Sequence, residues 1–219
     1  MLLHLVAVWQ GLLRVFLDRL INGLICLALV AAFTAVPALG VARPLPRGFL
    51  TTGQYVFYFI ICLTAFAAGS LGQQASIKRW LKPVGLSEWN ERIGFFTYGG
   101  LYLTSALLCM RMKLALFGSY DQVNLLVYIG WILTVLGGYL FVTGIAAPQK
   151  IAKIAYPHYL GVIFLASGLA FSHLTWFPLL ALPGILVFMR WRIVKMENSQ
   201  DVQPVSLPAG VWRVIPFFY

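Results

Sequence analysis

Long apolar runs separated by short polar segments make up most of the chain. Four of these runs are each about 18–23 residues long, enough for a helix to cross the roughly 30 Å hydrocarbon core of a bilayer. We therefore predict membrane-spanning helices at Leu20–Ala42, Tyr55–Gln74, Ile93–Met110 and Leu125–Ala146. Residues 1–19 are apolar with few charges, and we expect them to lie in the membrane interface as a short helix.

The last apolar block, Pro157–Met189, is too long for a single span. It is interrupted by the sequence SHLTWFP at 172–178. Pro178 suits the first turn of a new helix, and Thr175 suits the cap before it. The block therefore forms either one long kinked helix or a tight hairpin of two helices.

The distribution of Lys and Arg between the two sides of the membrane favours the hairpin over the single kinked helix. With six spans, one side of the membrane holds Arg14, Arg19, Lys78, Arg79, Lys82, Arg92, Lys150, Lys153, Arg190, Arg192, Lys195 and Arg213, and the other side holds Arg43, Arg47, Arg111 and Lys113. With five spans the two sides carry equal numbers. Because cytoplasmic loops carry the Lys and Arg excess, we predict about six transmembrane helices with both termini in the cytoplasm.

The composition identifies the class of protein. Hydrophobic residues make up 61% of the 219 positions and charged residues only 10%, whereas soluble domains carry about 25% charged residues. We therefore predict an all-α integral membrane protein, expected in a bacterial inner membrane, with membrane lipid and other membrane subunits as candidate partners. The net charge of +10 reflects basic residues that flank the spans, so nucleic acid is not an expected partner.

Small residues line one face of the predicted fifth span. Gly168 and Ser172 each fall within about 20° of Gly161 at 100° per residue. A smooth face of this kind is typical of a close helix–helix contact in lipid, which is the interpretation we favour. The alternative is that a cofactor or a lipid lies along this face.

A pattern of residues recurs through the last third of the chain: Pro157, Tyr159 and Gly161, then Arg190, Arg192 and Glu197, then Arg213, Val214 and Pro216. With these residues the last third resembles isoprenylcysteine carboxyl methyltransferases and related bacterial membrane methyltransferases. Those proteins share an Arg-His-Pro-x-Tyr-x-Gly stretch, a tight helical hairpin, a helix end with Arg and a Glu-Glu pair, and a short tail. The chain departs from the pattern at Ala155 and Tyr156, where the family has Arg and His, and at Met196, where it has the first Glu.

The apolar runs place four transmembrane helices at 20–146. The resemblance, which covers the last third of the chain, implies a methyltransferase-like hairpin at 147–198 followed by a cytoplasmic tail at 199–219, and it also implies a cofactor. The implied cofactor is S-adenosylmethionine. Its predicted binding residues are Tyr159, Gly161, Arg190, Arg192 and Glu197, with Lys153 and His158 as additional polar groups.

Two functions stay open at this point, and no catalytic residue is assigned. The first is transfer of a methyl group from S-adenosylmethionine to a lipophilic acceptor. The second is a non-catalytic structural or accessory subunit of a larger membrane complex, favoured by the loss of the family's Arg and His. A haem site at His158 is disfavoured, and no metal site is expected, because His158 and His173 lie about 22 Å apart along a helix.

Overall fold

Five helices make up the described part of the chain. The computed structural model describes residues 2–41, 52–72, 125–146, 154, 156–175, 179–180 and 182–198. Side chains are described over a narrower range in three of the helices: residues 9–32 in the first, from residue 55 in the second, and up to residue 195 in the last. The helices are α1 (Leu2–Val41), α2 (Thr52–Leu71), α5 (Leu125–Ala146), α6 (Pro157–Ser172) and α7 (Leu182–Asn198). The predicted third span and the tail at 199–219 lie outside the described residues.

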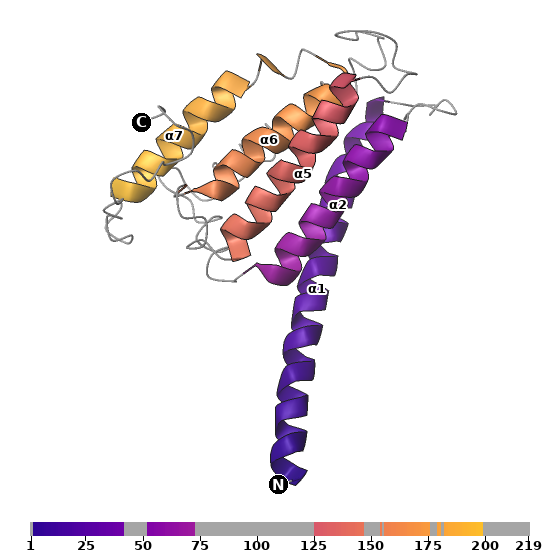
Figure 1. Cartoon of the computed structure of the whole chain (residues 1–219), viewed down its shortest axis with the longest axis vertical. Helices are drawn as coiled ribbons and strands as arrows, with labels where there is room; N and C mark the ends of the chain where they lie inside the picture. Colours follow the sequence, from indigo (N-terminus) through magenta and orange to yellow (C-terminus); the bar gives the residue numbers. More distant parts are fainter. Residues whose placement is uncertain are drawn as a thin grey trace.

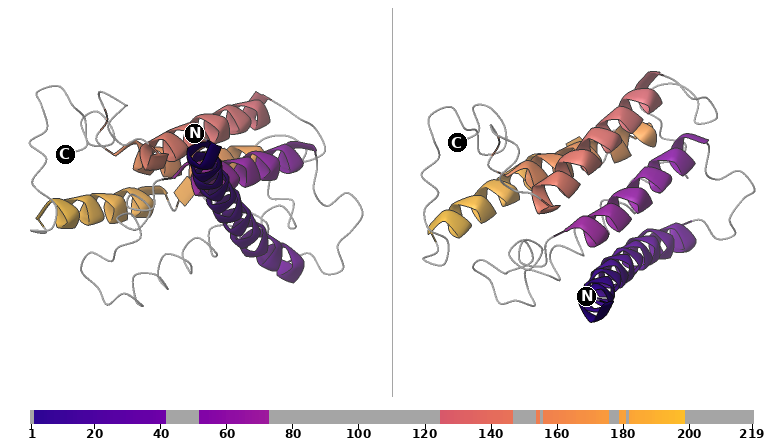
Figure 2. Two further views of the ribbon diagram at one scale, coloured as in Figure 1. Left: turned by 90° about the horizontal axis from the view of Figure 1, so that it is seen from below. Right: turned by 60° about the horizontal axis from the view of Figure 1, so that its bottom comes forward.

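The helices lie side by side, each packed on the next (Figure 1). Contacts join α1 to α2, α2 to α5, α5 to α6, and α6 to α7, with a smaller contact between α2 and α6. The two views in Figure 2 agree that α2 lies between α1 and α5. In Figure 1, α2, α5 and α7 run from the upper end of the bundle to the lower end, and α6 runs the opposite way. The all-helical fold predicted from the sequence is therefore confirmed for the described residues.

Two helices in the described part are long and apolar enough to cross a membrane, at Trp9–Ala32 and Leu125–Ala146. Two further apolar helices, Tyr55–Leu71 and Pro157–Ser172, are shorter. Helix α5 has the predicted bounds, whereas α2 begins and ends three residues earlier than predicted. The described residues therefore supply fewer full-length spans than the six expected from the charge count.

Helix α1 is longer than predicted. It is continuous from Leu2 to Val41, so no break separates residues 1–19 from the span expected to begin at Leu20. The sequence between Leu12 and Ile21 contains no glycine or proline that would end a helix. As a result, the N-terminal half of α1 projects beyond the ends of the other helices (Figure 1).

Glycines bring α5 and α6 into backbone contact. A Cβ atom added at Gly161 would lie 2.7 Å from the carbonyl oxygen of Gly137, and one added at Gly137 would lie 2.8 Å from the carbonyl oxygen of Gly161. Gly144 faces His158 in the same way. Only a missing side chain allows such an approach, which is a recognised mode of helix association in membranes.

The small-residue face of α6 is therefore filled by α5. Gly168 faces Thr134, and Ser172 faces Gly130, so the same helix covers the whole predicted stripe. The helix–helix interpretation is confirmed. The alternative, a cofactor or lipid lying along this face, is wrong because the α5 backbone occupies the space.

The turn after α6 establishes the hairpin. The N–H of Thr175 donates to the carbonyl of Ala170, and the N–H of Leu174 donates to the carbonyl of Phe171. This pair of bonds is the Schellman arrangement, which stops a helix with one residue in the left-handed region. That residue is Leu174, with φ of 50°, and its side chain is buried.

The hairpin predicted from the charge count is thus present, but its second helix starts later than expected. Helix α7 begins at Leu182, with Pro183 rather than Pro178 in its first turn. The hydroxyl of Thr175, expected to cap that helix, is buried and has no hydrogen-bond partner among the described residues. The cap prediction is therefore wrong, because α7 begins at Leu182, seven residues after Thr175, and a capping side chain reaches only the helical turn that directly follows it.

Candidate functional site

The start of α6 meets the end of α7 through a hydrogen bond between two buried polar side chains. The Nε–H of Arg192 donates to the hydroxyl oxygen of Tyr159 at 2.9 Å, across 33 residues of sequence. Tyr159 is 3% exposed and Arg192 is 8% exposed. Pro157 starts α6, so Tyr159 lies in its first turn, and the antiparallel hairpin places the last turns of α7 beside it. A hydrogen bond from a charged donor stabilises by about 1.5–3 kcal/mol.

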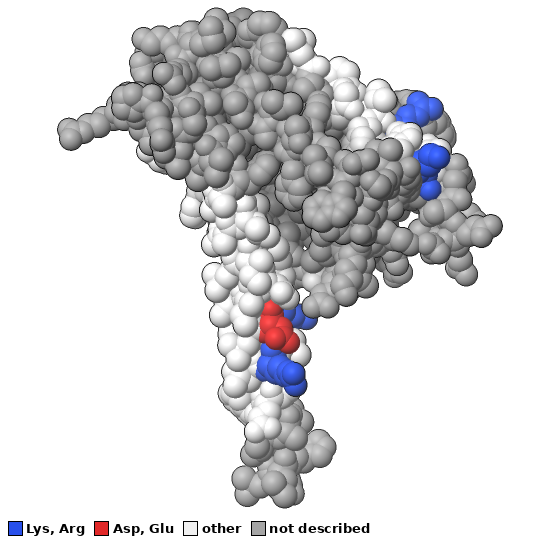
Figure 3. Space-filling model, turned by 180° about the vertical axis from the view of Figure 1, so that it is seen from behind, with Lys and Arg blue, Asp and Glu red and all other residues white. Residues whose placement is uncertain are grey.

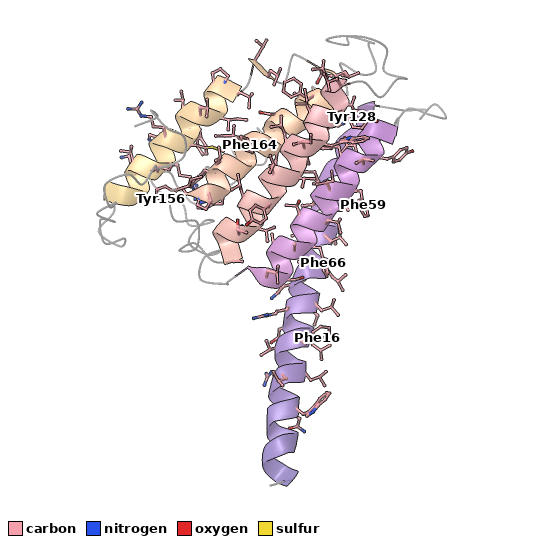
Figure 4. The ribbon with its side chains drawn as sticks, viewed as in Figure 1. Phe16, Phe59, Phe66, Tyr128, Tyr156 and Phe164 are labelled. Atoms are coloured by element: carbon pink, nitrogen blue, oxygen red, sulfur yellow. The ribbon has the colours of Figure 1, made fainter. Side chains whose placement is uncertain are left out.

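Apolar side chains surround this hydrogen bond. Tyr159 packs with Met189 and Ile193, and the half-buried Tyr156, Val162, Ile163 and Ile185 pack against them. Figure 4 labels Tyr156 at this end of the hairpin. Charges act over longer distances and more strongly where apolar groups exclude water. The guanidinium of Arg192 therefore provides a positive charge in a shielded site.

His158 adds a third polar group to this site. Its ring lies 4.5 Å from the ring of Tyr159, centre to centre, and it is close enough to Arg192 to experience its charge. Its Nδ1 atom is buried and has no hydrogen-bond partner in the part of the chain described. A buried polar atom without a partner is uncommon in folded proteins, so the unused hydrogen-bonding capacity of this nitrogen sets the position apart. We call Tyr159, Arg192 and His158 the hairpin cluster.

The other predicted cofactor residues do not all join the hairpin cluster. Gly161 faces α5, where it lies against the backbone of Gly137, so it does not join the hairpin cluster. Arg190 is exposed on α7, two residues from Arg192, and therefore lies on another side of that helix. Glu197 belongs to α7, but its side chain is outside the described residues, as is the whole of Lys153.

Position 156 shows how the site differs from the family pattern. Tyr156 stands where the resemblance has His, and its ring packs at 6.2 Å from His158 and 6.1 Å from Tyr159. An aromatic ring thus fills space beside the hairpin cluster. Ala155, where the family has Arg, lies outside the described residues.

A second polar cluster, at the opposite end of α6, was not predicted. His173 is fully buried, and its Nδ1 lies 2.9 Å from the carbonyl oxygen of Leu169. A carbonyl only accepts, so Nδ1 carries the proton and Nε2 accepts from the hydroxyl of Tyr58, 3.2 Å away. Phe57 packs edge-to-face on the same imidazole. Tyr58 was missed because nothing distinguishes it from the other aromatics of its apolar run.

His158 and His173 therefore belong to separate sites. His158 lies in the first turn of the helix, and His173 follows its last residue. Among the residues that the structure describes, no group of three His, Cys, Asp or Glu side chains is placed to hold a metal ion.

Comparisons with family models, with curated proteins and with solved structures gave no match for this chain.

Proposed function

We propose that the chain is a membrane-embedded methyltransferase-like protein that transfers a methyl group from S-adenosylmethionine to a lipophilic acceptor. The observation that carries this proposal is the buried hydrogen bond between Tyr159 and Arg192. These are two residues that the family resemblance assigns to the cofactor site, one near the start of α6 and the other near the end of α7. Their meeting in a shielded, positively charged cluster supports a shared role in binding an anionic group.

The hairpin cluster suits the carboxylate end of the cofactor. A guanidinium binds a carboxylate through parallel N–H donors, and the hydrogen bond donated by the Nε–H of Arg192 to Tyr159 fixes the plane of its guanidinium group. The unpartnered Nδ1 of His158 offers one more donor or acceptor beside it. When bound, S-adenosylmethionine would supply the electrophilic methyl group on its sulfonium.

The chain's own residues would act by binding, orientation and exclusion of water. Arg192 would bind the carboxylate, and Tyr159 would hold the guanidinium in place. The apolar side chains of Met189 and Ile193 would keep water from the site and strengthen these interactions. The hairpin cluster accounts for binding of the carboxylate end of the cofactor. Gly161 takes no part in this binding.

We place the hairpin cluster at the cytoplasmic face in a topology of about six spans. The ends of α2, α5 and α7 and the start of α6 lie at the same end of the bundle in Figure 1. Arg192 and Lys195 lie at this end, as the positive-inside rule requires of a cytoplasmic face. The cofactor would then enter from the cytoplasm and the acceptor from the bilayer.

Calorimetric titration with S-adenosylmethionine tests the proposal. Losing one partner of a buried, charged hydrogen bond costs about 2–5 kcal/mol in binding, so Arg192→Ala should weaken affinity roughly 30-fold or more. Arg190→Ala is the matched control, since it removes the same charge from an exposed position on the same helix. Equal affinity in both variants would contradict the assignment of Arg192.

A second candidate is a non-catalytic accessory subunit that keeps the methyltransferase-like fold. The close packing of α5 on the glycine face of α6 favours it, because that face is no longer available to a cofactor. This candidate predicts no heat and no thermal shift with millimolar S-adenosylmethionine. It also predicts that the protein co-purifies from native membranes in a complex whose stability is unchanged by Arg192→Ala.

A further inference from the structure

The N-terminal half of α1 presents an apolar stripe that no other described helix covers. Trp9, Leu13 and Phe16 lie within about 60° of one another around the helix. Trp9 is 71% exposed and Phe16 is 62% exposed. Figure 4 labels Phe16 on the part of α1 that projects beyond the bundle.

The contact with α2 shows where this uncovered segment begins. Gly69 of α2 faces Asn22 of α1, and Gly23 of α1 faces Ser70 of α2. Helix α2 ends at Leu71, so the α1 residues before Asn22 extend past its end. The projecting segment thus starts at the level where the bundle stops.

A straight α1 does not suit a bilayer. Forty residues of helix are about 60 Å long, roughly twice the hydrocarbon thickness. If residues from Leu20 onward cross the membrane beside α2, the exposed Trp9 and Phe16 would stand in water. Burying such side chains is strongly favourable, so a surface must cover them.

The charges of this segment identify that surface. Arg14 and Arg19 lie on either side of the apolar stripe, about 130° and 90° from its centre, while Asp18 lies about 170° away. Figure 3 shows these charged atoms gathered on one part of the projecting helix, with uncharged atoms along the rest. Both cations lie closer to the stripe than the anion does, and the long arginine side chains can reach lipid phosphates, which matches a surface with an apolar interior and anionic headgroups.

We propose that residues 2–19 dock flat on the anionic phospholipid surface at the cytoplasmic end of the bundle, with a bend in α1 near Asn22 and Gly23. Trp9, Leu13 and Phe16 enter the headgroup boundary, and Arg14 and Arg19 bind lipid phosphates from either side. Asp18 faces water. Asparagine and glycine are weak helix formers, and glycine is a common site of helix kinks, so the bend has a suitable position. This inference does not depend on cofactor binding.

Spin labels on the full-length protein test the docking. In a chain with Cys26, Cys62 and Cys109 replaced by alanine, a label is attached at Leu13→Cys on the stripe or at Gly11→Cys on the opposite side. Gly11 is a suitable control because a Cβ atom there meets nothing within 4 Å. Both proteins are placed in nanodiscs of phosphatidylcholine, with and without about one-third phosphatidylglycerol. The accessibility of each label to oxygen and to a water-soluble nickel complex is then measured.

Docking predicts that the label at position 13 is reached by oxygen and protected from nickel, while the label at position 11 is reached by nickel. The protected population should be larger with phosphatidylglycerol, and Arg14→Gln and Arg19→Gln should each reduce it about fivefold. Equal nickel access at both positions, or no dependence on anionic lipid, would overturn the proposal. Protection at position 13 that persists in detergent with spin–spin broadening would also overturn it, because a second copy of the chain would then cover the stripe.

Discussion

Replacing Gly161 by alanine introduces one methyl group at the closest point between α5 and α6. The new Cβ atom would lie 2.7 Å from both the Gly137 carbonyl oxygen and the Phe141 backbone nitrogen. Both neighbours are backbone atoms of a helix, so no side chain can rotate away. The two helices would have to separate by several tenths of an ångström along the contact.

The expected cost follows from two opposing effects. Overpacking a tight contact destabilises by about 1–3 kcal/mol, while glycine to alanine in a helix stabilises by about 0.5–1 kcal/mol. Gly161→Ala should therefore lower the free energy of unfolding by about 0.5–2 kcal/mol, and Gly161→Leu by more. Gly11→Ala is the matched control, because its methyl group enters open space and only the helix preference changes.

Reversible unfolding of the purified protein in mixed detergent micelles, followed by circular dichroism, measures both variants against the wild type. Gly11→Ala should be as stable as the wild type or slightly more stable, and Gly161→Ala less stable. If both alanine variants shift the transition equally, the α5–α6 contact is looser than the structure indicates, and the reasoning from backbone contact fails.

Three further predictions concern the turn, the second polar cluster and the topology. Leu174→Ala should destabilise the protein by about 1 kcal/mol more than Leu174→Gly in the same assay, because both variants lose the buried side chain but only alanine keeps the energetic cost of a positive φ. A glycine variant less stable than the alanine variant would contradict the left-handed conformation at this position. Tyr58→Phe should cost about 1–3 kcal/mol by leaving the buried acceptor of His173 without its donor, and unchanged stability would show that this hydrogen bond is unimportant. Reporter fusions after Met196 should be cytoplasmic, and a periplasmic signal there would refute the even number of spans.

Local patterns in the sequence were enough to predict several elements. The apolar run from Leu125 to Ala146 has no charge, so its helix bounds were predicted correctly. The spacing of Gly161, Gly168 and Ser172 predicted a helix contact, but it carries no information about which helix is the partner. That partner is α5, whose own glycines recur with a matching spacing.

Identifying the site required knowing how the helices pack, which the spacing of residues along the sequence does not reveal. The resemblance placed both Arg190 and Arg192 near the cofactor, yet two residues apart on a helix means about 200° of rotation. Only the packing of α7 on α6 shows that Arg192 faces Tyr159. The pairing of Tyr58 with His173 joins residues far apart in sequence, and neither residue belongs to a motif.

Calorimetric titration of S-adenosylmethionine into the wild-type protein and Tyr159→Phe tests the central claim most directly. The variant removes only the hydroxyl that accepts the Nε–H of Arg192, so the apolar packing and the charge both remain. We expect a dissociation constant on the order of micromolar for the wild type and about tenfold weaker binding for the variant, equivalent to roughly 1.4 kcal/mol. No heat from the wild type at millimolar cofactor, or equal affinity in the two proteins, would contradict the claim that the hairpin cluster binds the cofactor.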